Sequence, residues 1–419
     1  MNGQKLQKRR NNLMLSKEEE IKMSKKATTR IRRYSKHSPM KEFALIFKIL
    51  QLIGIKTFDC SDKRYGISSR DISTRNTEHK TFSCIKAYEY FIFILVCSKI
   101  FLNLLWVWLL PDKVNEFTHI FLVAILVLCY VSIYRRRRVL FRMAECITRI
   151  YRKLPPRSVE RYKYLLITSF VFLEITTIAS SVMLIYAEKN TSESQKSESE
   201  LKLFMDSLSV EVSYCFLLAR SVEILFYCIT FAVLSLFTMY YGLACRFICS
   251  IIQRLLNKYK NNCLLQDVEG LIDIHGDIEN CMSYMDEKLS FPAFLLVVMN
   301  MSGLFWASYK IVYFSDMNNY FFISMIYFTI FHSLLQLVMI ISASITNELA
   351  TKLKHFVRRL PYLFPTRHSE IKFKLKQNVM QDNYLTLWNI YVIHRSLIIA
   401  SFGTLLTYGF LIGSLGKES

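Results

Sequence analysis

The sequence is poor in glycine, in proline and in acidic residues. Its 419 residues include only 11 Gly and 7 Pro, which leaves few places for turns and linkers, so helices should dominate. Acidic residues number 33 against 54 Lys and Arg, for a formal charge of +21. Such a charge is typical of nucleic-acid-binding proteins, yet 52% of the residues are hydrophobic and the mean hydropathy is +0.24. The combination argues against a soluble enzyme and indicates a membrane protein whose charge is confined to its loops.

The sequence also lacks the common motifs of catalysis and of nucleotide or metal binding. It contains no HExxH, no Walker A sequence, no GxGxxG and no GxSxG. Its 11 Cys fall in apolar or basic segments and not in the loops assigned below to the outside, so no disulfide framework is indicated. We therefore expect no enzymatic activity, no cofactor and no metal site.

Apolar runs long enough to cross a ~30 Å hydrocarbon core occur seven times along the chain. The last is the least conspicuous, because His394 and Arg395 interrupt its first turns. The sequence thus predicts an all-α membrane protein with a seven-transmembrane domain over residues 86–413. The predicted spans cover residues 86–110, 115–134, 162–187, 208–240, 289–314, 320–346 and 391–413.

The basic residues predict the orientation of these spans. Of the 54 Lys and Arg residues, 45 lie in the N-terminal segment and in the loops on its side, and 5 lie in the alternate loops and the C-terminal tail. This asymmetry predicts a cytosolic N-terminus and an extracellular C-terminus. The run Arg135–Arg138, which alone would suggest a nucleic-acid patch, is interpreted as the cytosolic end of the second span. In the outward loop 188–207, the sequon Asn190-Thr191-Ser192 makes Asn190 a predicted glycosylation site.

The cytosolic segments predict three further features. Residues 1–40 are basic and polar, without the apolar core of a cleavable signal peptide, and we expect them to be disordered. Residues 41–56 contain an apolar helix too short to span, interpreted as an interfacial helix lying along the membrane. The apolar periodicity of the fourth to sixth spans continues through 251–256, 265–288 and 353–357, which predicts a cytosolic helical anchor region.

Ionisable residues inside the spans are candidates for functional roles, because charge is expensive there. Glu174 lies midway along the third span, and Arg220 and Glu223 lie at a similar depth in the fourth. A Glu174–Arg220 pair, with Glu223 as a competing partner, would either hold two helices together or contact a ligand.

Aromatic residues are dense in the outer halves of the spans. Trp306, Tyr309 and Lys310 lie near the outer end of the fifth span. They belong either to the interfacial belt of aromatic and snorkelling side chains or to an outward-facing pocket for a small ligand.

The last span carries a stripe of residues suited to a narrow pore. Thr407, Leu411 and Ser414 fall at i, i+4 and i+7, which places them on one helix face. Here the sequence resembles the insect gustatory receptors of the arthropod chemoreceptor superfamily, whose C-terminal signature is Thr-Tyr, five apolar residues and Gln-Phe. This chain has Thr407-Tyr408 and the same spacing, but Ser414-Leu415 stands where Gln-Phe is expected. The apolar segment Phe47–Ile55, with an early Lys and a late Gly, is similar to the family's opening segment.

The resemblance implies a seven-transmembrane, ligand-gated cation channel in the plasma membrane of sensory neurons. It implies a homo- or hetero-tetramer with other gustatory receptor subunits, in which the last helix of each subunit lines the pore and each subunit binds a small tastant. By position, Leu411 and Ser414 would lie near the extracellular gate, and Thr407 and Tyr408 are further candidates for the pore. The ring of Gln side chains expected of the family would be absent.

Two other classes remain as alternatives. A G-protein-coupled receptor would have its N-terminus outside, and the sequence has no Asp-Arg-Tyr after the third span and no Asn-Pro-x-x-Tyr in the seventh. A secondary transporter would show internal repeats and helices broken at matching places, of which Pro292 is the single hint.

Overall fold

The protein is nearly all helical in the part of the chain that its computed structural model describes. The predicted disordered segment 1–40 lies almost wholly outside this part, as does the predicted glycosylation site Asn190. The described residues are 39–52, 55, 90–103, 113–154, 168, 171–179, 183, 212–261, 265–313, 319–363 and 384–415.

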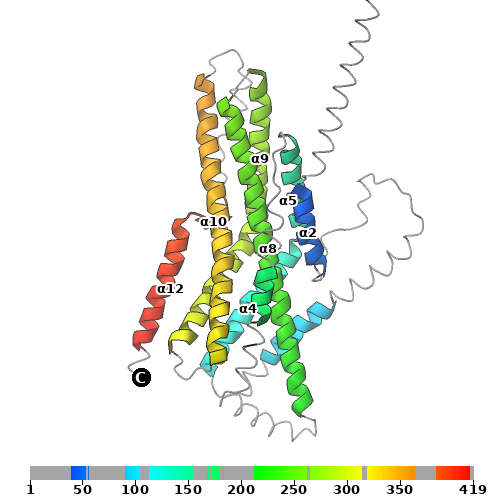
Figure 1. The fold of residues 1–419 in the computed structure, drawn as a ribbon, viewed down its shortest axis with the longest axis vertical. Helices are drawn as coiled ribbons and strands as arrows, with labels where there is room; N and C mark the ends of the chain where they lie inside the picture. The colour runs from blue at the N-terminus through cyan, green and yellow to red at the C-terminus, as the bar shows by residue number, and fades with distance from the viewer. Residues whose placement is uncertain are drawn as a thin grey trace, which may run out of the picture.

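Three long helices form the centre of the fold and run side by side along the long axis of the molecule (Figure 1). They are α8 (Val212–Asn261), α9 (Leu265–Tyr313) and α10 (Asn319–Leu363). At ~1.5 Å per residue, the 50 residues of α8 extend about 75 Å, more than twice the thickness of a bilayer core. The three helices therefore continue through the apolar stretches 251–256, 265–288 and 353–357, as the sequence predicts, and α9 continues through Pro292.

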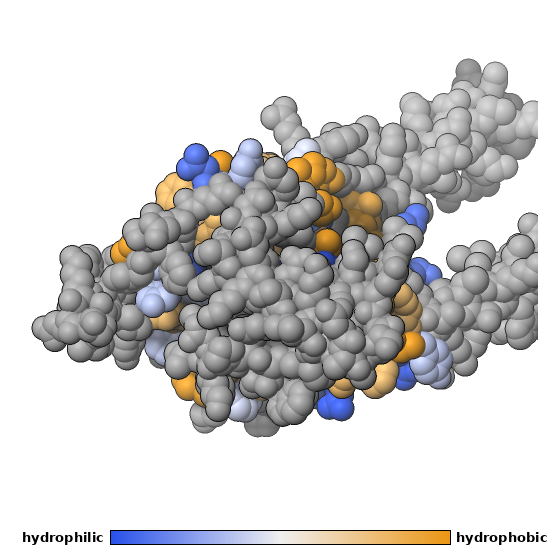
Figure 2. Space-filling model, turned by 90° about the horizontal axis from the view of Figure 1, so that it is seen from below, coloured by the Kyte–Doolittle hydropathy of each residue, from blue (hydrophilic) through white to orange (hydrophobic). Residues whose placement is uncertain are grey.

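These three helices are also long and apolar enough to cross a membrane. Two shorter apolar helices, Tyr90–Asn103 and Ile120–Arg135, fall inside the first and second predicted spans. Large hydrophobic side chains such as Phe93, Ile175 and Leu218 are exposed on the outside of the fold, and hydrophobic residues are visible at its outer edge in Figure 2. A surface of this kind is suited to contact with lipid.

A second group of helices packs on the upper half of the three long ones in Figure 1. It consists of α2 (Pro39–Leu52) and α5 (Arg137–Arg152), which a turn at Arg136 separates from α4 (Lys113–Arg135). Together, α2, α5 and the upper halves of α8, α9 and α10 form what we call the upper bundle. The helix predicted over 41–56 is thus present, but the apolar face that we expected to lie along the membrane is buried against α5 and α8.

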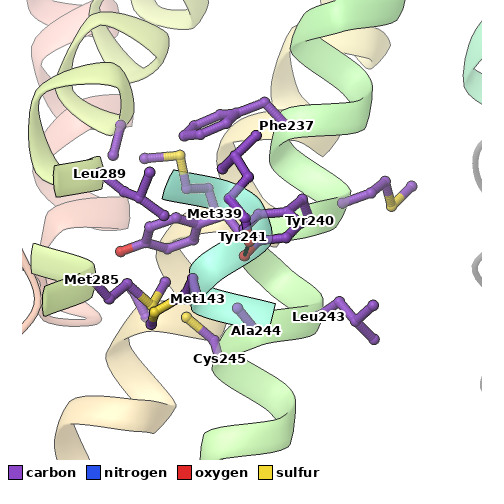
Figure 3. Close-up of a cluster of buried hydrophobic side chains, with 14 of the residues drawn as sticks. Met143, Phe237, Tyr240, Tyr241, Leu243, Ala244, Cys245, Met285, Leu289 and Met339 are labelled. Atoms are coloured by element: carbon purple, nitrogen blue, oxygen red, sulfur yellow. Dashed lines mark hydrogen bonds between the residues drawn. The ribbon is translucent and has the colours of Figure 1, made fainter. Parts of the chain in front are cut away.

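Aromatic and sulfur-containing side chains fill the core of the upper bundle. Tyr240 and Tyr241 of α8 are fully buried and lie between Met143 of α5, Met285 of α9 and Met339 of α10 (Figure 3). The Tyr240 hydroxyl donates a 2.6 Å hydrogen bond to the carbonyl oxygen of Leu140, which satisfies the one polar atom of that side chain. Two rings of α2, those of Phe43 and Phe47, pack on the other side of Tyr240.

A short antiparallel hairpin precedes the last helix, α12 (Ser396–Leu415). Strand β1 (Thr386–Leu387) pairs with β2 (Tyr391–Val392), and Trp388 and Asn389 in the turn have positive φ angles. The prediction that the seventh span begins at Tyr391 is therefore wrong. Residues 391 and 392 form β2 of the hairpin, Ile393 beside them is buried, and the helix begins only after Arg395.

Candidate functional site

An ion-pair cluster joins helix Tyr90–Asn103 to α8 within the apolar part of the fold. The ammonium group of Lys99 donates a 2.5 Å hydrogen bond to Oε1 of Glu223, and Nη1 of Arg220 lies 3.2 Å from Oε2 of the same carboxylate. Lys99 is only 3% exposed. Buried charges must be paired, and here one carboxylate is the shared partner of two cations.

The structure revises the pairing expected from the sequence. Arg220 pairs with Glu223, one turn away on its own helix, which is the competing partner that the sequence analysis allowed. Glu174 instead faces Ser235 of α8, and its Oε1 is buried without a hydrogen-bond partner among the described residues. Sequence reasoning missed Lys99 as a site residue, although the rule that selected the other three, an ionisable group inside a span, applies to it equally.

Aromatic rings continue this cluster along one face of α8. Glu223, Tyr227 and Phe231 are spaced four residues apart, so they lie one above the other. The Lys99 ammonium lies 5.3 Å from the centroid of the Tyr227 ring, within cation–π range, and the Tyr227 and Phe231 rings stack at 5.8 Å. A charged end and an aromatic wall thus form one continuous surface.

Rings from α9 and α10 complete the aromatic wall. Phe231 contacts Phe328 at 5.9 Å between ring centroids, and Phe328 contacts Trp306 at 5.7 Å. Trp306, a pocket candidate from the sequence, therefore belongs to this wall. Tyr309 and Lys310 lie partly buried one turn further along α9. We call the membrane site the set Lys99, Arg220, Glu223, Tyr227, Phe231, Trp306, Phe328 and His332.

His332 links the aromatic wall to a buried polar group. Its Nδ1 lies 2.9 Å from Oδ1 of Asn300 on α9, and both residues are fully buried. A Cβ added to Gly303 would lie 2.8 Å from the imidazole ring, so only glycine allows the ring this close to α9. Nε2 of His332 and Nδ2 of Asn300 have no partner among the described residues. Apolar walls with a few unpaired polar atoms are typical of sites that bind small ligands.

Helix α12 contains the residues predicted to line a pore. Its helical backbone includes Thr407, Tyr408, Leu411 and Ser414, but the side chains of the last three lie outside the described part. The Thr407 side chain is exposed, and its hydroxyl donates to the carbonyl oxygen of Gly403 at 2.9 Å. Figure 1 shows α12 at the side of the long helices.

The fold is that of the insect olfactory receptors. The structure is similar to that of the olfactory receptor OR5 from Machilis hrabei in complex with eugenol, with a TM-score of 0.60 and 14% identity over 90% of this chain and 98% of that one. A second structure of this receptor is similar at a TM-score of 0.52 and 12% identity, over 89% of this chain and 97% of that one. No protein-family model matches the chain, and no curated protein matches its sequence.

The resemblance to arthropod chemoreceptors that short motifs indicated is therefore confirmed at the level of the fold. It extends over most of both chains. The solved structures that the protein resembles are of receptors and not of enzymes.

Proposed function

We propose that the protein is a gustatory chemoreceptor, a subunit of a tastant-gated, non-selective cation channel in the plasma membrane of sensory neurons. The observation that carries this proposal is the similarity to an insect olfactory receptor over nearly the whole of both chains. The gustatory assignment rests on Thr407-Tyr408 and its spacing from the C-terminal end of α12.

The proposed assembly is a homo- or hetero-tetramer with seven spans per subunit, a cytosolic N-terminus and α12 lining the central pore. The distribution of basic residues supports the orientation. The exposure of apolar side chains on α12, with Ile399 at 78%, supports burial of this helix against other subunits. Glycosylation at Asn190 tests the orientation, because only an extracellular Asn190 would be modified; its modification in cells is the expected result, and a cytosolic Asn190 would overturn the proposed topology.

The proposed tastant site is the membrane site. Its rings on α8, α9 and α10 offer an aromatic wall, and its ion-pair cluster offers charged hydrogen-bonding groups at one end. A small, partly apolar molecule with one polar end would match this arrangement.

Recording of membrane current tests the proposal. The protein is expressed in oocytes without added G protein and exposed to sugars, alkaloids and eugenol, which the similar olfactory receptor binds. A rapid cation current that persists when G proteins are blocked is expected. A current lost on blockade would indicate a G-protein-coupled receptor, and uptake of a compound without current would indicate a transporter.

Variants of two phenylalanines of α10 distinguish a loss of ligand binding at the membrane site from a general disturbance of the helix. Phe328→Ala removes a ring that contacts Trp306 and Phe231 and should raise the half-maximal agonist concentration about tenfold, because truncating a central aromatic contact costs more than ~1 kcal/mol. The matched control is Phe322→Ala, since Phe322 is exposed on the same helix. Equal shifts in both variants would remove the membrane site from the proposal.

A further inference from the structure

The hairpin before α12 is held by side chains from two of the long helices. The most complete contact is made by Asn347 of α10, whose side chain is 2% exposed. Its Nδ2 donates to the carbonyl oxygens of Leu385 and Ile393, at 3.0 Å each, and its Oδ1 accepts from the backbone N–H of Leu385 at 2.8 Å. One amide thus binds both strands at the open end of the hairpin.

A second contact comes from Asp286 of α9. Its Oδ1 accepts hydrogen bonds from the backbone N–H of Thr386 at 2.5 Å and from the Thr386 hydroxyl at 2.9 Å. The hydroxyl also accepts from the N–H of Asn389, which is in the turn with a positive φ of 57°. The carboxylate therefore fixes both β1 and the turn that follows it.

Two further contacts hold the turn and the residue that precedes α12. The ring of Trp388 packs on Phe291 and Phe294 of α9, at 5.2 and 5.3 Å between centroids. The guanidinium of Arg395 makes two bonds to the carboxylate of Glu348, at 2.6 Å from Nε and 2.9 Å from Nη2. Apart from the backbone turns at His394 and Arg395 that lead into α12, the hydrogen bonds, ion pair and ring contacts described for residues 385–395 are made with α9 or α10, or within the hairpin itself.

We propose that this hairpin couples the N-terminal end of α12 mechanically to α9 and α10. Displacements of α9 and α10 at the membrane site would then reach the proposed pore helix through the hairpin. The proposal rests on the proposed function. Asn347, Asp286 and Trp388 act as positioning residues in this scheme, because they touch neither the ligand site nor the pore face of α12.

Helix α10 is suited to carry such a displacement. It contains both His332 of the membrane site and Asn347, about 22 Å apart along the helix axis at ~1.5 Å per residue. No Pro or Gly interrupts α10 between these residues, so the segment can move as a rigid rod. Among the described side chains of α12, those of Ile399, Phe402 and Thr407 are exposed, and the direct contacts of α12 with α9 and α10 are a second route within the subunit.

Hydrogen–deuterium exchange on the purified full-length protein tests the coupling without any ligand. Asn347→Ala removes all the bonds of the amide, and exchange of residues 385–398 should rise about tenfold or more, since each lost hydrogen bond is worth ~1 kcal/mol. The matched control is Thr351→Ala, one turn further along α10, whose hydroxyl bonds only the carbonyl of Asn347 within its own helix. Unchanged exchange in the Asn347 variant, or an equal rise in both, would refute the proposal.

Membrane current in oocytes gives a second readout that a merely structural role would not move. Arg395→Gln breaks an exposed ion pair and should fold; it should lower the maximal agonist current per receptor at the cell surface several-fold, with little change in the half-maximal concentration. The charge-swapped variant with Glu348→Arg and Arg395→Glu should restore it. Loss of surface protein in proportion to current would contradict coupling.

Failure of the proposed channel function can be distinguished from failure of the proposed coupling through the hairpin. If no compound of the panel, eugenol included, opens the wild-type protein, the proposed function fails, and the exchange experiment alone decides whether the hairpin moves with α9 and α10. If the wild type opens and the Arg395→Gln variant opens equally well, the coupling fails and the channel function stands.

Discussion

In the membrane site, one carboxylate is shared by two cations. Removing the carboxylate should therefore lower the stability of the protein much more than removing one of the cations. Glu223 pairs with both Lys99 and Arg220, so its removal and the removal of one cation are different perturbations. Glu223→Gln leaves two cations without the acid that they share. Lys99→Met leaves the acid paired with Arg220 and replaces a buried ammonium with an apolar side chain of similar length.

The expected magnitudes follow from burial. Lys99 is 3% exposed, and breaking a buried pair so that a charge remains unpaired costs about 3–5 kcal/mol. Glu223→Gln should therefore lower stability by an amount in this range. Lys99→Met should cost about 1 kcal/mol or less, because exchanging a buried charge for a well-packed apolar group is often neutral once the remaining charges are balanced.

The double variant completes the test. Once Lys99 is Met, the Glu223→Gln change no longer leaves the buried Lys99 ammonium without its acid. The remaining cation, Arg220, is 27% exposed and can reach water, so the loss of stability should fall to about half. Thermal unfolding of the detergent-solubilised protein, followed by fluorescence-detected size-exclusion chromatography, measures all three variants. Equal losses from Glu223→Gln and Lys99→Met, or strictly additive losses in the double variant, would refute the shared-acid interpretation.

Three shorter predictions address other parts of the molecule. Gly303→Ala should lower the free energy of unfolding by about 1–3 kcal/mol, because the added Cβ would clash with the imidazole ring of His332. The control Gly270→Ala, with open space around it, should leave stability unchanged or raise it, and thermal unfolding compares the two variants. The Cys281 thiol of α9 lies beside the Cys146 thiol of α5, and its interaction with the Cys146 sulfur lowers the pKa of Cys146, so alkylation of Cys146 should reach its plateau at a lower pH than that of an ordinary thiol. Diamide should cross-link the pair; mass spectrometry detects both products, and failure to cross-link would contradict the packing of α5 on α9. Leu411→Ala should widen an apolar constriction and raise the basal current in oocytes, and an unchanged current would count against Leu411 at the gate.

Helix continuity was predictable from sequence because it depends on local periodicity. The apolar residues of α8, α9 and α10 recur at helical spacing through the upper bundle as well as through the membrane, and few Gly or Pro interrupt them. The start of α12 was not predictable in this way. Apolar residues at 391–393 fit a span and a short strand equally well, and long-range bonds such as those of Asn347 decide between them.

The sequence predicts that charged residues inside the spans contribute to the membrane site, but not which of them form ion pairs with one another. The cost of burying charge selects Glu174, Arg220 and Glu223 from sequence alone. Which of them pair depends on how the helices face one another, and periodicity does not fix that rotation. The same limit explains why Lys99 was not recognised as a site residue, because its partner Glu223 lies 124 positions away along the chain.

The basic run after the second span acquires a structural role that its charge alone did not indicate. Arg136 lies in the turn between α4 and α5, where it donates to the Ser132 hydroxyl at 2.8 Å and lies 5.5 Å from the Phe291 ring centroid. Phe291 is also one of the rings on which Trp388 of the hairpin packs. Arg136, which we expect at the cytosolic end of the second predicted span, thus shares an aromatic partner with the hairpin that precedes the proposed pore helix. The feature used to predict the orientation of the chain therefore also contributes to the contacts that would position the proposed gate.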